Sequence, residues 1–102
     1  MKSISAEELH AKLAEGQKPF LLDVREELEF HTFNIGGENI PLGSLIQSID
    51  ELEINPEEEI VVICQRGIRS LTACGVLEAA GYTQVLNLKD GLLGWQKHQQ
   101  SS

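Results

Sequence analysis

The sequence predicts an α/β fold with a mainly parallel central sheet flanked by helices on both faces. Residues 60–63 form a continuous, apolar and β-branched run, which is typical of a parallel strand covered on both faces. A helical pattern follows at residues 70–80, where Leu71, Cys74 and Leu77 are expected to share one face. Other short apolar runs alternate with helical segments along the chain, and this alternation favours parallel strands.

The first half of the chain shows local signals for each expected element. Ser5 and Glu8 have the spacing of a capping box, so a helix is expected to begin there and to end at Gly16. The apolar run 20–24 predicts a buried strand, and residues 26–31 predict a short helix. Residues 34–41 are rich in Gly and end in Pro, which indicates a turn region.

The second half predicts a sheet strand on either side of the long helix. Leu45, Ile49 and Leu52 mark one face of a helix that precedes the strand at 60–63. Residues 85–88 predict a short strand, and residues 91–98 a last helix with Leu92 and Trp95 facing inward. The polar tail 96–102 is expected to fray.

Composition limits the classes of protein to which the chain can belong. A chain of 102 residues that is 41% hydrophobic has enough apolar side chains for one core, so residues 1–102 are expected to form a single domain. The formal net charge of −8 disfavours nonspecific binding to nucleic acid or to an anionic membrane surface. Residues 1–5 have no apolar run of signal-peptide length, and we expect a cytoplasmic protein.

The two cysteines give no sign of a disulfide framework or a metal site. Cys64 and Cys74 are ten residues apart and have no His close to them in the sequence. This spacing does not match a zinc site, and no nucleotide-binding glycine motif is present. We therefore expect neither a metal nor a cofactor.

The segment 64–70 lies between the clearest strand and the clearest helix. In open α/β folds, ligands bind beyond the carboxyl ends of strands, where the unpaired N–H groups of a helix N-terminus favour anions. Loop dipoles together with Arg66 and Arg69 should lower the pKa of Cys64 and produce the nucleophilic thiolate. Gly67 would allow the backbone to curl toward the sulfur.

Each cysteine can also be explained by packing alone. A cysteine at the end of an apolar strand is often a small buried hydrophobic residue, and taken alone Cys64 could be either that or a nucleophile. The positive, Gly-containing loop that follows favours the nucleophile, because an inert core cysteine needs no such loop. Cys74 shares the apolar helical face with Leu71 and Leu77, and we interpret it as a packing residue.

The sequence resembles the rhodanese-like domains over nearly its whole length. Residues 21–26 (LLDVRE) resemble the family's LIDVRE segment, and Glu29-Phe30 follow at the usual distance. Residues 64–70 resemble the active-site loop C-x-x-G-x-R-S. Residues 87–95 resemble the closing L-x-G-G-x-x-x-W segment. The combination of these motifs is highly specific.

The resemblance implies sulfur transfer through a persulfide on Cys64. Arg66 would attract the anionic donor, and Arg69 would either hold the loop in place or contact the substrate. The resemblance makes Cys64 the predicted catalytic residue, and the predicted substrate-binding residues are Gln65, Arg66, Gly67, Ile68, Arg69 and Ser70. Expected partners are a small anionic sulfur donor such as thiosulfate and an acceptor that is a thiol, cyanide or a sulfur-carrier protein. The protein would act as a monomer or a weak homodimer.

Two alternatives and two departures accompany this resemblance. Related phosphatases and arsenate reductases have five residues between the Cys and the Arg of the loop, whereas this chain has four, so a phosphatase is disfavoured. The other alternative is a non-catalytic rhodanese-like binding or sulfur-relay module that serves molybdopterin, thiamine or tRNA thiolation partners. The segment that begins at Asn34 is one residue shorter than in many members. It is similar to the form found in rhodanese domains attached to adenylating enzymes of molybdopterin and thiamine sulfur pathways. Asp90 stands where many members have Gly, which would make the mouth of the pocket more acidic or reshape it.

Overall fold

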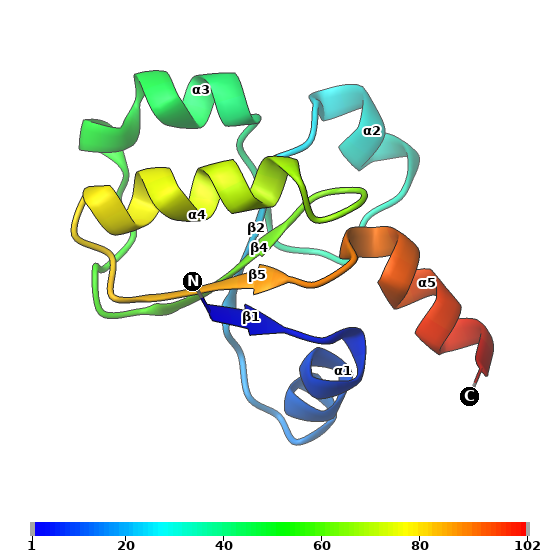
Figure 1. The fold of residues 1–102 in the computed structure, drawn as a ribbon. Coiled ribbons are helices and arrows are strands. Elements are labelled where there is room, and N and C mark those ends of the chain that lie inside the picture. Colours follow the sequence, from blue (N-terminus) through cyan, green and yellow to red (C-terminus); the bar gives the residue numbers. More distant parts are fainter. Residues whose placement is uncertain (1, 102) are drawn as a thin grey trace.

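The computed structural model describes residues 2–101, which form a parallel sheet between two layers of helices (Figure 1). The strands in chain order are β1 (Lys2–Ile4), β2 (Phe20–Asp23), β3 (Glu38–Asn39), β4 (Glu59–Ile63) and β5 (Gln84–Leu88). The helices are α1 (Ala6–Ala14), α2 (Glu27–Thr32), α3 (Leu42–Gln47), α4 (Arg69–Ala79) and α5 (Gly91–Ser101), with a 3₁₀ turn at Ile49–Glu51.

The sheet has the order β1-β5-β4-β2-β3, and every neighbouring pair is parallel. Val62 of β4 lies beside Leu22 of β2 and beside Asn87 of β5. Because all strands run the same way, their carboxyl ends meet at one edge of the sheet. The predicted α/β class with a mainly parallel sheet is confirmed, and β4 lies in the middle of that sheet.

Side chains of β4 alternate between two apolar cores. Val62 packs with Cys74 and Leu77 of α4 on one face of the sheet. Val61 and Ile63 pack on the other face in a cluster that also holds Leu9, Leu92 and Trp95 of α1 and α5. Figure 1 shows α3 and α4 on one side of the sheet and α1 on the other. The expected burial of Trp95 is confirmed, since this residue is 8% exposed.

The beginning of α1 follows the predicted capping box. The backbone N–H of Glu8 donates to Ser5 Oγ and the backbone N–H of Ser5 donates to Glu8 Oε1, both at 3.0 Å. Two unpaired donors at the helix start are thereby satisfied. Gly16 follows the helix with a φ of +81°, the left-handed conformation that commonly ends helices.

Several predicted boundaries differ from the structure. The edge strands β1 and β3 were not predicted, because strands of three and two residues show no periodicity. The polar tail expected from residue 96 is instead helical through Ser101, and the Gln99 side chain hydrogen-bonds His10 of α1. Within the described residues, no helix is long and apolar enough to cross a bilayer.

Leu71 does not share the buried face of α4. It is 45% exposed, whereas Ser70, Cys74 and Leu77 are fully buried. An α-helix turns about 100° per residue, so Leu71 lies well to the side of a face centred near Ser70 and Cys74. The predicted inward position of Leu71 is therefore wrong, while the predicted packing role of Cys74 agrees with its burial.

Candidate active site

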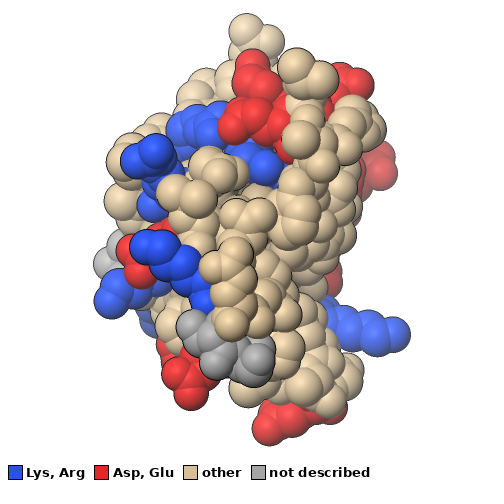
Figure 2. Space-filling view, turned by 90° about the vertical axis from the view of Figure 1, so that its right-hand side faces the viewer, with Lys and Arg blue, Asp and Glu red and all other residues tan. Residues whose placement is uncertain are grey.

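The loop between β4 and α4 lies at the carboxyl edge of the sheet. Cys64 follows the last residue of the central strand directly, and α4 begins five residues later at Arg69. The loop thus places a cysteine beside the N-terminus of an 11-residue helix. Figure 2 shows this side of the molecule, where Lys and Arg side chains gather although the formal net charge is −8.

Cys64 Sγ is surrounded by hydrogen-bond donors from its own loop. The backbone N–H of Gly67 donates to Sγ at 3.0 Å, and that of Ser70 at 3.4 Å. Ser70 Oγ lies 3.3 Å from the same sulfur. Gly67 has a φ of +87°, and this left-handed conformation turns its N–H toward the sulfur.

These contacts set the pKa of Cys64 below its ordinary value. Burial of the thiol has the largest effect and acts in the opposite direction, because it disfavours the charged form. The Ser70 side chain and the backbone N–H groups of Ser70, Arg66 and Gly67 together outweigh it. Loop dipoles and the two arginines were expected to lower this pKa, and the contribution of the Ser70 hydroxyl was not predicted.

Cys74 has the opposite environment. It is fully buried in α4, and burial raises its pKa to about 12. Its sulfur therefore stays protonated under ordinary conditions. The pKa values of the two cysteines are thus shifted in opposite directions, that of Cys64 downward and that of Cys74 upward.

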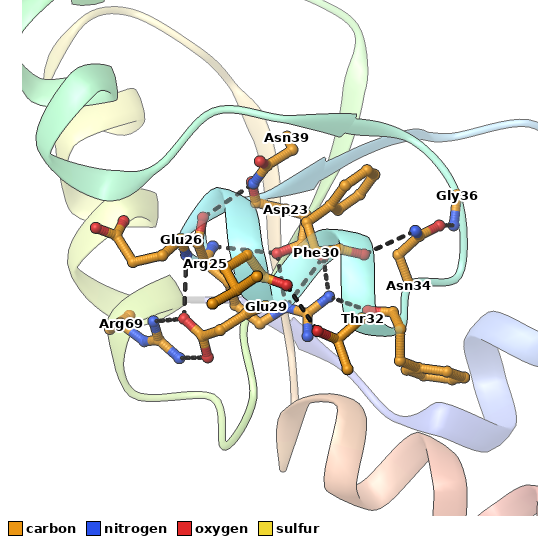
Figure 3. A network of polar contacts seen from close by, with 12 residues as sticks. Asp23, Arg25, Glu26, Glu29, Phe30, Thr32, Asn34, Gly36, Asn39 and Arg69 are labelled. Carbon is orange, nitrogen blue, oxygen red and sulfur yellow. Dashed lines mark hydrogen bonds and ion pairs between the residues drawn. The ribbon is translucent and has the colours of Figure 1, made fainter.

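Arg69 is tied to α2 and does not point freely into solvent. Its guanidinium donates to both carboxylate oxygens of Glu29, at 2.6 and 2.9 Å (Figure 3). This contact lowers the pKa of Glu29 to about 2. Of the two roles expected for Arg69, the geometry matches the one that holds the loop in place.

A buried ion pair lies beside this contact. Nε and Nη2 of Arg25 donate to the Asp23 carboxylate at 2.8 to 3.2 Å, and Nη2 also donates to the carbonyl of Phe33 at 2.6 Å (Figure 3). Asp23 and Arg25 are almost fully buried, so the pair links the end of β2 to the end of α2.

The other predicted loop residues surround the mouth of the site. A pocket next to the sulfur is lined by Cys64, Gln65, Arg66, Ile68 and Arg69. Arg66 is exposed and also lines a neighbouring hollow with Asp90 and Lys97. The structure therefore brings all seven predicted site residues together around one sulfur atom.

The first turn of α5, which follows β5, hydrogen-bonds to the backbone of the Cys64 loop. The backbone N–H of Leu92 donates to the carbonyl of Cys64 at 2.9 Å, and that of Leu93 to the carbonyl of Gln65 at 3.1 Å. A Cβ on Gly91 would lie 2.4 Å from the Cys64 carbonyl oxygen, so only glycine allows this approach. Asp90 adopts a φ of +62°, a left-handed conformation that glycine adopts more readily than other residues.

Asn34, the other departure, has a local structural role. Its side-chain amide donates to the carbonyl of Phe30 at 2.9 Å, and its Oδ1 accepts the N–H of Gly36 at 2.9 Å (Figure 3). The residue therefore ends α2 and starts the following turn, and no contact connects it with Cys64.

Two residues near the loop were missed as members of the site. Glu29 was noted only as part of a motif, and its contact with Arg69 crosses 40 residues of sequence. Asn87 of β5 is 6% exposed and accepts a hydrogen bond from the Ser70 hydroxyl. The available signal for Asn87 was a polar residue within an otherwise apolar strand.

Three histidines lie apart from the sulfur. His10 and His98 contact each other with ring centroids 5.4 Å apart, and His31 lies 3.6 Å from Glu27. Among the described residues, no three His, Cys, Asp or Glu side chains are grouped so as to hold a metal ion.

Known proteins share this arrangement over most of the chain. Residues 5–98 match the model of the rhodanese-like domain. A sulfurtransferase of Allochromatium vinosum is 32% identical over 98 residues, which cover 96% of this chain and 91% of the relative. The probable adenylyltransferase/sulfurtransferase MoeZ of Mycobacterium tuberculosis is 32% identical over 99 residues, covering 96% of this chain. The chain spans only 25% of the length of that larger relative.

Solved structures give the same result. The crystal structure of a rhodanese-like domain protein from Staphylococcus aureus superposes with a TM-score of 0.82 at 29% identity, covering 93% of this chain and 91% of that one. A human single-domain sulfurtransferase gives a TM-score of 0.80 at 29% identity, covering 95% and 96%. With the matched family model, the sheet order and the cysteine loop in agreement, the chain belongs to the rhodanese-like domain family.

Proposed function

We propose that this protein transfers a sulfane sulfur from a small anionic donor such as thiosulfate to a thiol or cyanide acceptor, through a persulfide on Cys64. The observation that carries the proposal is the position of Cys64 Sγ, which lies within 3.4 Å of two backbone N–H donors, one from Gly67 in the loop and one from Ser70 in the first turn of α4. A packing cysteine does not require inward-facing donors. Rhodanese-like relatives are named sulfurtransferases, which supports the same reaction class.

The proposed reaction has two halves. The Cys64 thiolate attacks the outer sulfur of thiosulfate, the S–S bond of the donor breaks, and sulfite leaves with its electron pair. The outer sulfur remains on Cys64 as a persulfide. An acceptor such as cyanide then attacks that sulfur, the new S–S bond breaks, and thiocyanate leaves while Cys64 returns as the thiolate. The attacking species is the thiolate, and the contacts around Sγ that lower the pKa of Cys64 increase its share without a separate general base.

The loop supplies stabilisation for the charge on sulfur. In the persulfide, negative charge resides on the outer sulfur atom, which would lie among the N–H groups of residues 65–70. Donors fixed in advance around a developing charge lower the barrier without reorganising during the reaction. The four residues between Cys64 and Arg69 make a small ring suited to a single sulfur atom, and this size disfavours a phosphatase.

Arg66 is the residue proposed to attract the donor. It is exposed at the mouth of the Cys64 pocket, whereas Arg69 is paired with Glu29. In a chain of formal net charge −8, a local cation lowers the cost of bringing a dianion to the thiolate.

A sulfur-carrier protein is a further acceptor that we propose. A putative sulfur carrier protein of Bacillus subtilis is 34% identical over 93 residues, and the MoeZ relative is named as both adenylyltransferase and sulfurtransferase. These names support a relay in which the persulfide passes to a partner. We further propose that the protein acts in the cytoplasm as one domain, as a monomer or a weak homodimer.

Steady-state kinetics test the proposal. With thiosulfate and cyanide varied together, a persulfide mechanism gives parallel double-reciprocal lines, and thiocyanate forms in proportion to enzyme. Cys64→Ser is expected to abolish this turnover, while the matched Cys74→Ser variant retains most of it. Turnover that survives in Cys64→Ser would overturn the proposal.

A further inference from the structure

The Ser70 hydroxyl lies between two atoms that compete for its single proton. Ser70 Oγ is 3.3 Å from Cys64 Sγ and donates a hydrogen bond to Asn87 Oδ1. All three residues are almost fully buried, at 0%, 1% and 6% exposed. Solvent therefore supplies little alternative hydrogen bonding, and the direction of this one O–H bond matters.

Asn87 is fixed so that its oxygen faces Ser70. Its Nδ2 group donates to the carbonyl of Gly67 at 3.4 Å. If the amide were flipped, its oxygen would face that carbonyl oxygen, which is unfavourable because both atoms are acceptors. The side chain on β5 thus contacts both the curled part of the loop and the hydroxyl at the start of α4.

We propose that Asn87 is a positioning residue that gives the Ser70 hydroxyl a second acceptor, so that its O–H group can donate either to Asn87 Oδ1 or to Cys64 Sγ. The hydroxyl points to Asn87 Oδ1 while Sγ is protonated or bonded to an outer sulfur, and it points to Sγ when Sγ carries the thiolate charge. For its part in turnover, this inference rests on the proposed sulfur transfer.

The switch acts when the persulfide is discharged. Cyanide attacks the outer sulfur, the bond from that sulfur to Cys64 Sγ breaks, and the electron pair of the bond stays on Sγ. As charge develops on Sγ, the Ser70 O–H rotates from Asn87 to the sulfur and stabilises the leaving thiolate. The proton stays on Ser70 throughout, so only a hydrogen bond changes partner. Asn87 keeps the hydroxyl hydrogen-bonded in the states in which Sγ is a poor acceptor.

The charged groups near Cys64 belong to residues other than Ser70 and Asn87. Arg66 and Arg69 lie in the loop, Glu29 reaches Arg69 from α2, and Asp90 follows β5. Substitutions at Ser70 or Asn87 change none of these charges. A change in the titration of Cys64 in such variants therefore reports hydrogen bonding and the position of the loop.

Titration of Cys64 by the ultraviolet absorbance of its thiolate tests the inference. Cys74, with a pKa of about 12, does not contribute below about pH 10, so the full chain can be used without altering it. Ser70→Ala is expected to raise the pKa of Cys64 by about one unit, the scale of one hydrogen bond to a charged atom. Asn87→Leu is expected to lower it by up to about one unit, because the hydroxyl loses its competing acceptor.

The pKa of Cys64 is expected to rise in Ser70→Ala and to fall in Asn87→Leu, and these opposite signs distinguish a positioning role of Asn87 from simple support of the loop. If Asn87 only held the loop in shape, its loss would move the N–H donors away from Sγ and raise the pKa. Asn87→Ala serves as a second variant with a smaller side chain, thermal melting confirms that each variant folds, and Ser44→Ala on an exposed part of α3 is the control. A pKa of Cys64 that rises or stays unchanged in both Asn87 variants would overturn the inference.

A double variant gives a second check. In Ser70→Ala/Asn87→Leu, the pKa of Cys64 should equal that of Ser70→Ala alone, because Asn87 acts through the hydroxyl. A further lowering in the double variant would contradict this coupling.

Discharge of the persulfide separates this inference from the proposed function. The titrations need no sulfur donor, so a wild type that forms no persulfide would refute the function and leave the titration result standing. Where the persulfide forms, single-turnover reaction with cyanide should be about three- to tenfold slower in Ser70→Ala, since a thiol of higher pKa leaves more slowly. An unchanged rate would contradict the proposed switch while leaving sulfur transfer intact.

Discussion

The ion pair between Arg69 and Glu29 fastens the loop to α2, and Glu29→Gln removes its charge at almost constant size. The two hydrogen bonds of 2.6 and 2.9 Å hold the pKa of Glu29 at about 2, below its ordinary value of 4.5. Both side chains are more than one-third exposed, so solvent screens the interaction. We therefore expect the variant to lower the free energy of unfolding by about 1 kcal/mol at neutral pH, the upper range for exposed pairs.

The dependence on pH follows from the direction of the pKa shift. Because folding lowers the pKa of Glu29, its stabilising contribution is complete above about pH 4.5 and disappears as the pH falls toward about 2. Urea unfolding of the wild type and of Glu29→Gln across this range measures the difference at each pH. The free-energy difference between the two proteins should shrink to almost zero at the acid end.

The matched control is Glu27→Gln on the same helix. Glu27 lies 3.6 Å from His31, and both side chains are mostly exposed, at 79% and 67%. Its replacement should change the free energy of unfolding little at any pH. A Glu29→Gln difference that stays constant from neutral pH to pH 2, or an equal loss in Glu27→Gln, would refute this account of the pair.

Three further predictions concern the loop and its surroundings. Inserting one Gly between Gly67 and Ile68 should lower sulfur transfer by ~10²–10³ with little change in melting, because the N–H donors move away from the sulfur; a normal rate in a normally melting variant would contradict this. Gly91→Ala should destabilise the protein by about 2–4 kcal/mol in urea unfolding, because its Cβ would meet the Cys64 carbonyl, whereas Gly43→Ala in open space on α3 should not. Arg66→Ala should raise KM for thiosulfate more than it lowers kcat in steady-state assays, since it acts on donor binding; an unchanged KM would place it away from the donor's path.

Elements with strong local signals could be predicted from the sequence. The continuous apolar run of β4, the capping box of α1 and the Gly-containing loop each depend on residues close together in the chain. The edge strands β1 and β3 could not be predicted, because they are defined by pairing with β5 and β2 and not by their own pattern. The buried face of α4 was misplaced at Leu71, since its core-facing positions depend on how the helix sits on the sheet.

The residues of the site also fall into a group that is local in sequence and a group that only the fold brings together. Cys64 and its loop are local in sequence, and their positions follow from one strand, one turn and one helix. Glu29 and Asn87 reach the loop across 40 and 17 residues of sequence, through α2 and β5. Only the three-dimensional fold determines which polar side chains meet the loop, so their partners could not be assigned beforehand.

Intact-mass measurement after incubation with thiosulfate tests the central claim most directly. The wild type and Cys74→Ser should each gain the mass of one sulfur atom, which cyanide then removes, and Cys64→Ser should gain none. Peptide mapping should place the added sulfur on Cys64, the thiol whose pKa its surroundings lower. A wild type that gains no sulfur, or sulfur found on Cys74 alone, would contradict the account and favour a binding module that does not carry sulfur.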